Sequence, residues 1–224
     1  MDIDQYGSAN IFNWSHQHLT DILTRGNKRI IQDPLIANAF KAIKREDFIR
    51  EPNQSKAYQD QQLEILNNQF MTQPTTVAQI LQLLHPRESK KYLDIGAGSG
   101  YVAALLGFIT GEQGKVYTLE RNQYIAEFAR QNILKYPNLA GIVQVVFKDG
   151  QEGYAEKAPF DFIHSSVAFT TVPSIIKNQL VVGGRMTVPT TNNDLRLIER
   201  VSPTDFDERI YEGFIFTEAQ DGIE

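Results

Sequence analysis

The sequence predicts an α/β protein with a doubly wound, mostly parallel sheet, and three observations carry this prediction. Strand and helix patterns alternate from residue 90 to about residue 190, as in a parallel sheet with helices on both faces. A glycine-rich turn at 96–100 joins an apolar strand directly to an apolar helix. Two strand-like segments, 192–202 and 207–219, then follow without a helix between them, which predicts an antiparallel C-terminal edge.

The segment before the sheet is expected to be a helical extension. Residues 1–60 are mostly helical in pattern, and Pro34 opens an apolar stripe at helical spacing. Residues 61–74 are polar, and we expect irregular chain there. A second amphipathic helix is expected to begin at Pro74 and to end at Pro86.

The core elements are expected to follow one another with short connections. Strands are expected at 90–96, 115–120, 143–147, 160–166 and 184–190, and helices at 102–110, 123–134 and 173–180. Gly183 and Gly184 are expected to form the turn into the last of these strands. We expect a single domain over 1–224, with the extension and a substrate loop at 1–74 and the cofactor-binding core at 75–224.

Composition indicates an ordinary globular enzyme and excludes several classes of site. The chain has 224 residues, of which 42% are hydrophobic and 22% charged. It has no cysteine, which excludes disulfides, a thiolate nucleophile and a zinc–thiolate site. His16 and His18 form the only close histidine pair, and both are expected on a polar helix surface, so no metal site is predicted.

Charge and hydropathy also limit the expected partners. The net charge is −5 and no basic cluster stands out, which disfavours nucleic acid as the main partner. No apolar run approaches the roughly 18 residues of a membrane span. The first residues lack the basic and apolar regions of a signal peptide. We therefore expect a cytoplasmic protein, and the absence of heptads is compatible with a monomer.

The glycine turn is the most informative stretch of the sequence. Asp94 ends an apolar strand, and Gly96, Gly98 and Gly100 follow at alternate positions. Glycine reaches positive φ and lets a ligand approach the backbone closely. The helix that follows offers unpaired N–H groups and a positive dipole end. We therefore expect a ligand that carries a carboxylate, a phosphate or a ribose at this turn.

Two acids at set distances separate the cofactor classes. Glu120 lies near the end of the second strand, 20 residues beyond Gly100, where it can accept hydrogen bonds from both ribose hydroxyls. Asp149 and Gly150 end the third strand. Gly98 to Ala103 also satisfies the dinucleotide fingerprint, but that match alone is weak. The positions of these acids are similar to those in methyltransferases, in which the residue that reads the adenine amino group stands at the place of Asp149. This resemblance implies a methyl donor rather than a dinucleotide.

Several segments together resemble one family. Asp94 to Gly100 resembles motif I of S-adenosylmethionine-dependent methyltransferases. The chain as a whole is similar to the protein-L-isoaspartate O-methyltransferase family, which has a Rossmann-like methyltransferase fold. The similar stretches, in the family's order, are 39–49, 58–65, 69–74, 93–101, 148–150, 159–166, 172–173 and 179–189.

The resemblance implies an activity and a set of site residues. Family members transfer a methyl group from S-adenosyl-L-methionine to the carboxylate of L-isoaspartyl residues in damaged proteins. Carried over by position, the donor site consists of Asp94, Gly96, Ala97, Gly98, Gly100, Glu120, Arg121, Asp149 and Gly150. The same carry-over places Gln69, Thr72 and Ala168 at the substrate, which is an isoaspartyl protein or peptide.

Thr72 is the candidate catalytic residue, as a positioning group rather than a base. A carboxylate has a pKa near about 4 and is already ionised at neutral pH, so no general base is needed. Thr72 stands at the family's serine position and can donate its hydroxyl proton to the substrate carboxylate. The alternative is that Thr72 only caps the helix that begins at Pro74.

The acceptor half departs from the family pattern. Leu66 and Asn68 replace two glycines of the substrate loop, so this loop is expected to follow another path or to fill the groove. Phe169 replaces an alanine, and 213–218 replaces an apolar segment. Three functions therefore stay open: isoaspartyl methylation, methylation of another acceptor, and donor binding without turnover.

Overall fold

The computed structural model describes residues 15–25 and 29–224. Within these ranges the helices are α1 (His16–Thr24), α2 (Pro34–Ala42), α3 (Pro74–Leu84), α4 (Tyr101–Thr110), α5 (Gln123–Leu134) and α6 (Ser174–Lys177). The strands are β1 (Leu63–Leu66), β2 (Gln69–Met71), β3 (Lys91–Ile95), β4 (Lys115–Glu120), β5 (Val143–Phe147), β6 (Phe160–Ser165), β7 (Leu180–Thr190), β8 (Asp194–Arg200) and β9 (Phe206–Glu212). None of these helices has the length and apolar composition needed to span a bilayer.

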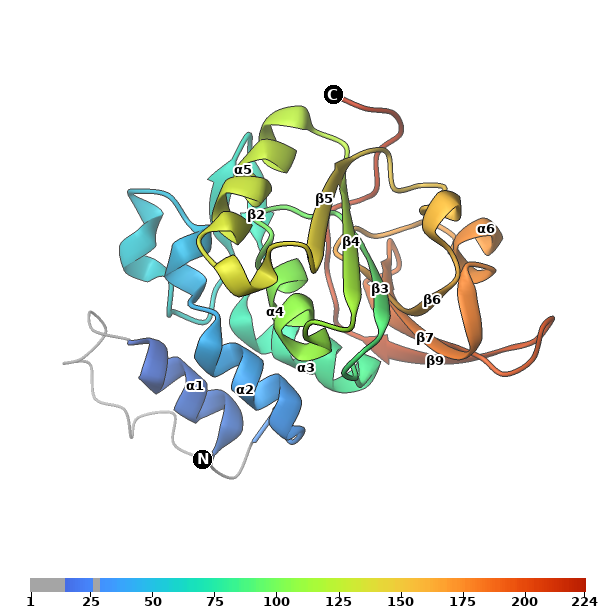
Figure 1. The fold of residues 1–224 in the computed structure, drawn as a ribbon, viewed down its shortest axis with the longest axis horizontal. Helices are drawn as coiled ribbons and strands as arrows, with labels where there is room; N and C mark the ends of the chain where they lie inside the picture. Colours follow the sequence, from blue (N-terminus) through green and yellow to red (C-terminus); the bar gives the residue numbers. More distant parts are fainter. Residues whose placement is uncertain (1–14, 26–28) are drawn as a thin grey trace.

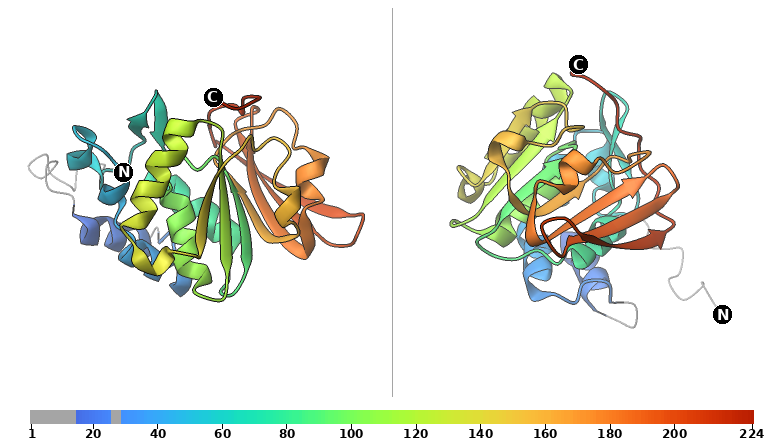
Figure 2. Two further views of the ribbon diagram at one scale, coloured as in Figure 1. Left: turned by 45° about the horizontal axis from the view of Figure 1, so that its top comes forward. Right: turned by 90° about the vertical axis from the view of Figure 1, so that its right-hand side faces the viewer.

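The main sheet has the predicted parallel body and antiparallel edge. Its strand order is β5-β4-β3-β6-β7-β8-β9, in which β5 to β7 run parallel and β8 and β9 antiparallel. Helices α4 and α5 lie on one side of the sheet and α6 on the other, as Figure 2 shows. The doubly wound α/β class is therefore confirmed.

Alternation along the strands gives the sheet two apolar faces. Tyr92, Val116 and Phe162 are partners across neighbouring strands and pack into the core that contains α2, α3 and α4. Leu93 and Leu119 point to the opposite face and join the core that contains α6. Successive strand residues point to opposite faces of the sheet, and both faces are buried. Residues at consecutive positions of each strand are therefore mostly apolar.

In the extension, α1 packs against α2, and α2 packs against α3 and α4 (Figure 1). Asp33 caps α2 by accepting the Leu35 N–H at 2.9 Å, and Pro34 occupies the first turn as predicted. Ile36 and Phe40 are buried on the face that meets α4. The second predicted helix is confirmed as α3, which ends at a left-handed His85.

The prediction of irregular chain at 61–74 was wrong. β1 and β2 pair antiparallel as a hairpin whose two-residue turn is Asn67-Asn68. Both asparagines have positive φ, 51° and 55°, as a tight hairpin turn of this kind requires. The segment lacks the Asn-Gly pair and the clear alternation that would have revealed it. Leu66 lies in the strand and does not have positive φ, so the left-handed conformation expected to be difficult for leucine is not required of it.

Three further expectations differ from the structure. Gly183 and Gly184 do not form a turn but lie inside β7, where Gly183 has a φ of 83° and the pairing with β6 shifts register. The helix expected at 173–180 is only the four-residue α6. The strand expected at 207–219 ends at Glu212.

Candidate functional site

A cleft of about 330 Å³ lies at the carboxyl ends of β3, β4, β5 and β6. β3 is the first strand of the parallel body, and chain order runs outward from it in both directions, which makes it the topological switch point where α/β sheets bind ligands. The cleft size falls within the range of small-molecule sites. Its walls are the glycine turn, the ends of β4 and β5, the hairpin and a strap formed by residues 217–224.

The structure brings most of the predicted site residues to this one cleft. The predicted residues that line it are Gln69, Thr72, Gly96, Ala97, Gly98, Glu120, Arg121, Asp149 and Gly150. Asp94, Gly100 and Ala168 do not line it. These three lie directly behind its walls, and their predicted contacts with ligands stay predictions.

The glycine turn has the predicted backbone conformation. Gly96, Gly98 and Gly100 have φ values of 88°, 53° and 86°. A Cβ on Gly98 would have only one neighbour within 4 Å, Ile65 Cδ1 at 3.8 Å, so the backbone here is open to a ligand. Gly100 is the N-cap of α4 and offers no side-chain cap, which leaves first-turn N–H groups available.

Glu120 fixes the glycine turn and faces the cleft. Its carboxylate accepts the N–H of Gly98 at 3.0 Å and the N–H of Asn122 at 3.1 Å. The side chain is mostly buried, and burial raises the pKa of Glu120 although these N–H groups oppose the shift. Each oxygen keeps a second lone pair, so the carboxylate can still accept hydroxyl protons from a sugar.

Asp94 lies under the turn, in the middle of the sheet. It is fully buried, and Thr118 donates its hydroxyl proton to Oδ2 at 2.6 Å. Oδ1 has no hydrogen-bond partner. Burial raises the pKa of Asp94 to about 7, with a smaller upward contribution from Glu120. The orphaned oxygen is a buried polar atom, and protonation of the carboxyl reduces the cost of leaving it without a partner.

Asp149 and Gly150 follow β5, and Gly150 packs against Ile95 at the end of β3. A Cβ on Gly150 would be 2.5 Å from Ile95 Cγ2, so glycine is required for this close approach. Asp149 accepts the N–H of Gln151 at 2.9 Å and the N–H of Gly222 at 2.7 Å. The acid expected at the adenine is therefore also an anchor of the strap.

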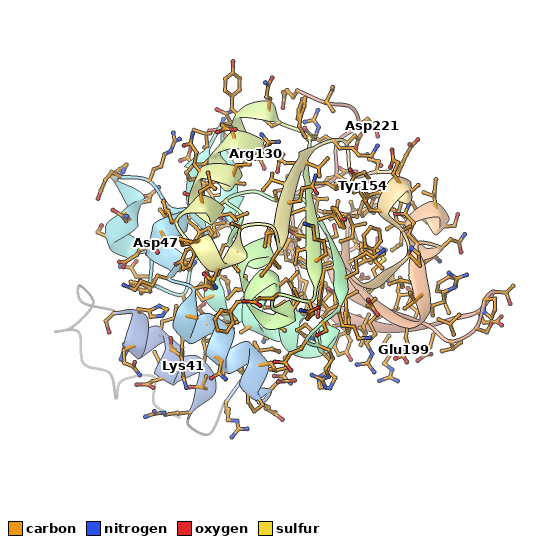
Figure 3. All side chains as sticks on the ribbon, viewed as in Figure 1. Lys41, Asp47, Arg130, Tyr154, Glu199 and Asp221 are labelled. Atoms are coloured by element: carbon orange, nitrogen blue, oxygen red, sulfur yellow. The ribbon has the colours of Figure 1, made fainter. Side chains whose placement is uncertain are left out.

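Arg121 binds the strap, and Asp221, one of the strap residues that it contacts, is labelled in Figure 3. Its guanidinium donates to the carbonyl oxygens of Gly222 at 2.7 Å and Asp221 at 3.1 Å. It also contacts Gln220 Oε1 at 3.0 Å and the Glu224 carboxylate at 3.2 Å. All four hydrogen bonds go to the strap, so within this structure Arg121 acts on the strap rather than on the open part of the cleft.

Thr72 lies on the opposite wall and does not cap α3. The N-cap of α3 is Gln73, which makes no side-chain capping bond. Asp60 takes that role by accepting the Thr75 N–H at 2.9 Å. The Thr72 carbonyl accepts from the buried Arg45 at 3.1 Å, and Arg45 also binds the carbonyls of Ala57 and Gln61. The capping alternative for Thr72 is thus excluded, and its hydroxyl remains available to a ligand.

The acceptor side contains residues that the sequence did not single out. Phe70 lines the cleft and is 50% exposed, so its ring is available to a ligand. Ser166 and Glu224 also line the cleft. Ala168 is buried and binds the strap through its backbone, with Ala168 N–H donating to Thr217 at 2.8 Å. The sequence offered one indication for Phe70, which is a single aromatic residue within a polar segment.

Neither histidine of the predicted surface pair belongs to a metal cluster. Among residues 15–25 and 29–224 no group of three or more metal-binding side chains occurs. His16 contacts the Lys41 carbonyl oxygen at 2.9 Å and packs on Tyr58. These contacts give His16 an ordinary structural role.

Comparison with known proteins decides the family. The model of the protein-L-isoaspartate(D-aspartate) O-methyltransferase family matches residues 14–221. The chain belongs to this family. A protein-L-isoaspartate O-methyltransferase from Aeropyrum pernix is 33% identical over 203 residues, which cover 91% of this chain and 75% of that protein. Its counterpart from Methanothermobacter thermautotrophicus is 33% identical over 202 residues, or 88% of this chain and 90% of that protein.

A solved family structure has the same fold. The structure of a protein-L-isoaspartate O-methyltransferase from Plasmodium falciparum, in complex with S-adenosyl-L-homocysteine, superposes with a TM-score of 0.80. The superposition covers 92% of this chain and 98% of the Plasmodium falciparum chain, and the two sequences are 21% identical. The Rossmann-like methyltransferase fold predicted for this member of the family is therefore confirmed.

Proposed function

We propose that this protein is an S-adenosyl-L-methionine-dependent carboxyl O-methyltransferase that acts on L-isoaspartyl residues of damaged proteins. The observation that carries the proposal is a single cleft that combines the glycine turn, Glu120 and Asp149 on one wall with Thr72 on the other. Family membership supports the same activity.

The residues present fit the methyl donor. Gly98 leaves its backbone open, and Glu120 presents carboxylate oxygens beside the turn, where a ribose would lie. Asp149 and the close-packed Gly150 form the floor at the end of β5, where the adenine would lie. When bound, the donor supplies an electrophilic methyl group on a sulfonium.

The chain then has to position the acceptor rather than to activate it. One carboxylate oxygen forms the new O–CH3 bond while the S–CH3 bond breaks and its electron pair stays on sulfur, so no proton moves. Thr72 lies where its hydroxyl can donate to the second carboxylate oxygen and fix the rotation of the group. The strap and the hairpin border the cleft on two sides. With donor and peptide bound, they would leave less room for water around the reacting atoms.

The deciding experiment is labelled methyl transfer to a pair of peptides that differ only in an isoaspartyl or aspartyl residue. We expect label on the isoaspartyl peptide alone, in a base-labile form, because the product is a carboxyl ester. A base-stable product, or equal labelling of both peptides, contradicts the proposal.

The altered acceptor wall favours one second candidate, a methyltransferase for a different carboxylate. The specific observation is Phe70, a large aromatic residue that lines the cleft and is half exposed. A screen of small carboxylic acids with labelled donor distinguishes the two candidates, since isoaspartyl peptides would then remain unlabelled.

We further propose that the enzyme works as a cytoplasmic monomer and does not use nucleic acid. The net charge of −5 supports the last point, because phosphate binding needs a basic face. Light scattering of the purified protein tests the oligomeric state, and a dimeric mass would overturn it.

A further inference from the structure

His164 and Ser166 form a polar connection from the sheet interior to the cleft. His164 lies on β6, is 3% exposed and is paired in the sheet with Asp94 on β3 and Thr187 on β7. Its Nδ1 lies 3.2 Å from Thr187 Oγ1, and its Nε2 lies 3.2 Å from Ser166 Oγ. Both ring nitrogens therefore have partners, and the ring orientation is fixed.

Ser166 lines the part of the cleft that the end of β6 forms. It follows β6 directly, its N–H donates to the Ile95 carbonyl at 2.8 Å, and it lines the cleft beside Gly96. β6 lies on the other side of β3 from β4, which carries Glu120. If Glu120 holds the ribose, the sulfonium end of the donor extends toward Ser166.

The tautomer of His164 decides what Ser166 offers to a ligand. With the ring proton on Nε2, Thr187 donates to Nδ1 and Nε2–H donates to Ser166 Oγ, so the Ser166 proton is free to point into the cleft. With the proton on Nδ1, the Ser166 proton points back to the ring and only lone pairs face the cleft. Lone pairs repel a carboxylate, whereas an O–H group binds one.

We propose that Ser166 is a second acceptor-binding hydroxyl, which His164, protonated on Nε2, directs at the isoaspartyl carboxylate. The inference rests on the proposed function and deepens it. Ser166 touches the substrate, and His164 is a positioning residue that acts through Ser166. Burial lowers the pKa of His164 to about 4, so the ring stays neutral and keeps a single N–H at working pH.

The proposal predicts an effect on KM rather than on kcat. The carboxylate loses its charge as the ester forms, so the Ser166 hydrogen bond is strongest before transfer. Ser166→Ala should raise KM for the isoaspartyl peptide by roughly tenfold, with little change in kcat or in the Kd for S-adenosylhomocysteine. Ser165→Ala is the matched control, because that neighbouring hydroxyl is buried, donates to the Val167 carbonyl and does not line the cleft.

His164 variants separate positioning from simple packing. His164→Leu should raise KM as Ser166→Ala does, and the double variant should be no worse than either single one. His164→Gln keeps an N–H donor near Ser166 and should restore most of the affinity for peptide. The proposal would be overturned if His164→Gln and His164→Leu lost affinity for the peptide equally and if the effects of His164→Leu and Ser166→Ala were additive. His164 would then act only through packing.

Nitrogen-15 NMR of the wild-type protein supplies a readout independent of activity. The His164 ring, assigned by comparison with His164→Gln, should show the Nε2–H tautomer. An Nδ1–H tautomer would overturn the proposal even if every leucine variant failed to fold. Absence of any methyl transfer by the wild-type protein would count against the proposed function instead, so the two failures are distinguishable.

Discussion

At the level of single side chains, the interior of the sheet carries a row of four polar residues that water does not reach. Thr118, Asp94, His164 and Thr187 lie on adjacent strands in direct register, and each is at most 3% exposed. The row lies on the face whose neighbouring positions are apolar, such as Tyr92. Only Asp94 in this row can carry a negative charge, and its Oδ1 has no partner.

Stability should therefore depend on the ionisation of Asp94. The pKa of Asp94 is raised to about 7 in the folded protein, against about 4 when unfolded. Between these values the folded state binds more protons than the unfolded state, so the free energy of unfolding falls as pH rises from about 4 to about 7. Asp94→Asn cannot ionise and should lose less stability over this interval, by on the order of 3 kcal/mol.

Urea unfolding of both proteins at about pH 5 and pH 8 measures this difference. Other titrating groups cancel, because they are the same in the two proteins. Equal losses of stability in wild type and variant would show that ionisation of the Asp94 carboxyl does not destabilise the folded protein.

The hydroxyl of Thr72 should contribute to transfer and not to donor binding. Thr72→Ala removes a hydrogen bond to a charged carboxylate, which should lower kcat/KM for an isoaspartyl peptide roughly 10- to 100-fold. The Kd for S-adenosylhomocysteine should stay unchanged. Thr76→Ala, on the helix α3 that follows Thr72, is the matched control, since Thr76 does not line the cleft. An unchanged kcat/KM for the isoaspartyl peptide in Thr72→Ala would remove Thr72 from the site.

Residue identity could be predicted where spacing reflects a local constraint. Gly96, Gly98, Glu120 and Asp149 line the cleft, and their positions at the ends of predicted strands could be used to predict this, because strand ends meet at one edge of a parallel sheet. The hydroxyl of Ser166 was not found. Its role depends on a buried histidine two residues earlier, and nothing in the sequence shows which way that ring points.

At the level of elements, the hairpin β1–β2 replaces glycine flexibility with two left-handed asparagines. Asn67 and Asn68 tolerate positive φ because their short side chains can bond locally, which a branched side chain cannot do. The hairpin carries Gln69, Phe70 and Thr72 to the cleft, so its turn sets the acceptor wall. The sequence did not predict this element, because its alternation spans only seven strand residues and the turn lacks glycine.

Substitution of the turn should affect the acceptor and spare the donor. Asn68→Val places a β-branched residue at positive φ and should cost about 1–2 kcal/mol in the stability of the hairpin. Hydrogen exchange of the β2 amides should quicken accordingly, and KM for the peptide should rise. Asn68→Gly is the matched variant and should keep wild-type values. A valine variant with unchanged exchange and KM would show that the turn is not strained.

At the level of the whole molecule, the strap joins segments that are far apart in sequence. Gly222 binds Asp149, and Ala168 binds both Thr217 and Ala219 through its backbone. Figure 1 shows this segment crossing the upper end of the sheet. Contacts of such range cannot be predicted from local patterns, which explains why 213–219 was mistaken for part of an edge strand.

The strap should slow exchange of the donor. Arg121→Ala removes four hydrogen bonds to the strap, and Gly222→Pro removes the N–H to Asp149 and cannot adopt the φ of 76°. Each should speed dissociation of S-adenosylhomocysteine by roughly three- to tenfold in stopped-flow measurements. Arg209→Ala, which breaks only a pair with Asp207 on β9, is the control. Unchanged dissociation in both strap variants would mean that the strap does not gate the site.

The central claim is that a methyl-donor nucleoside lies over the glycine turn with its ribose on Glu120. Calorimetric titration tests this most directly, with S-adenosylhomocysteine and NAD as ligands and Glu120→Ala as the variant. We predict one equivalent of S-adenosylhomocysteine bound, at least about tenfold weaker binding to the variant, and no heat with NAD. Tight NAD binding with no heat from S-adenosylhomocysteine, or equal affinity of the variant, would contradict it.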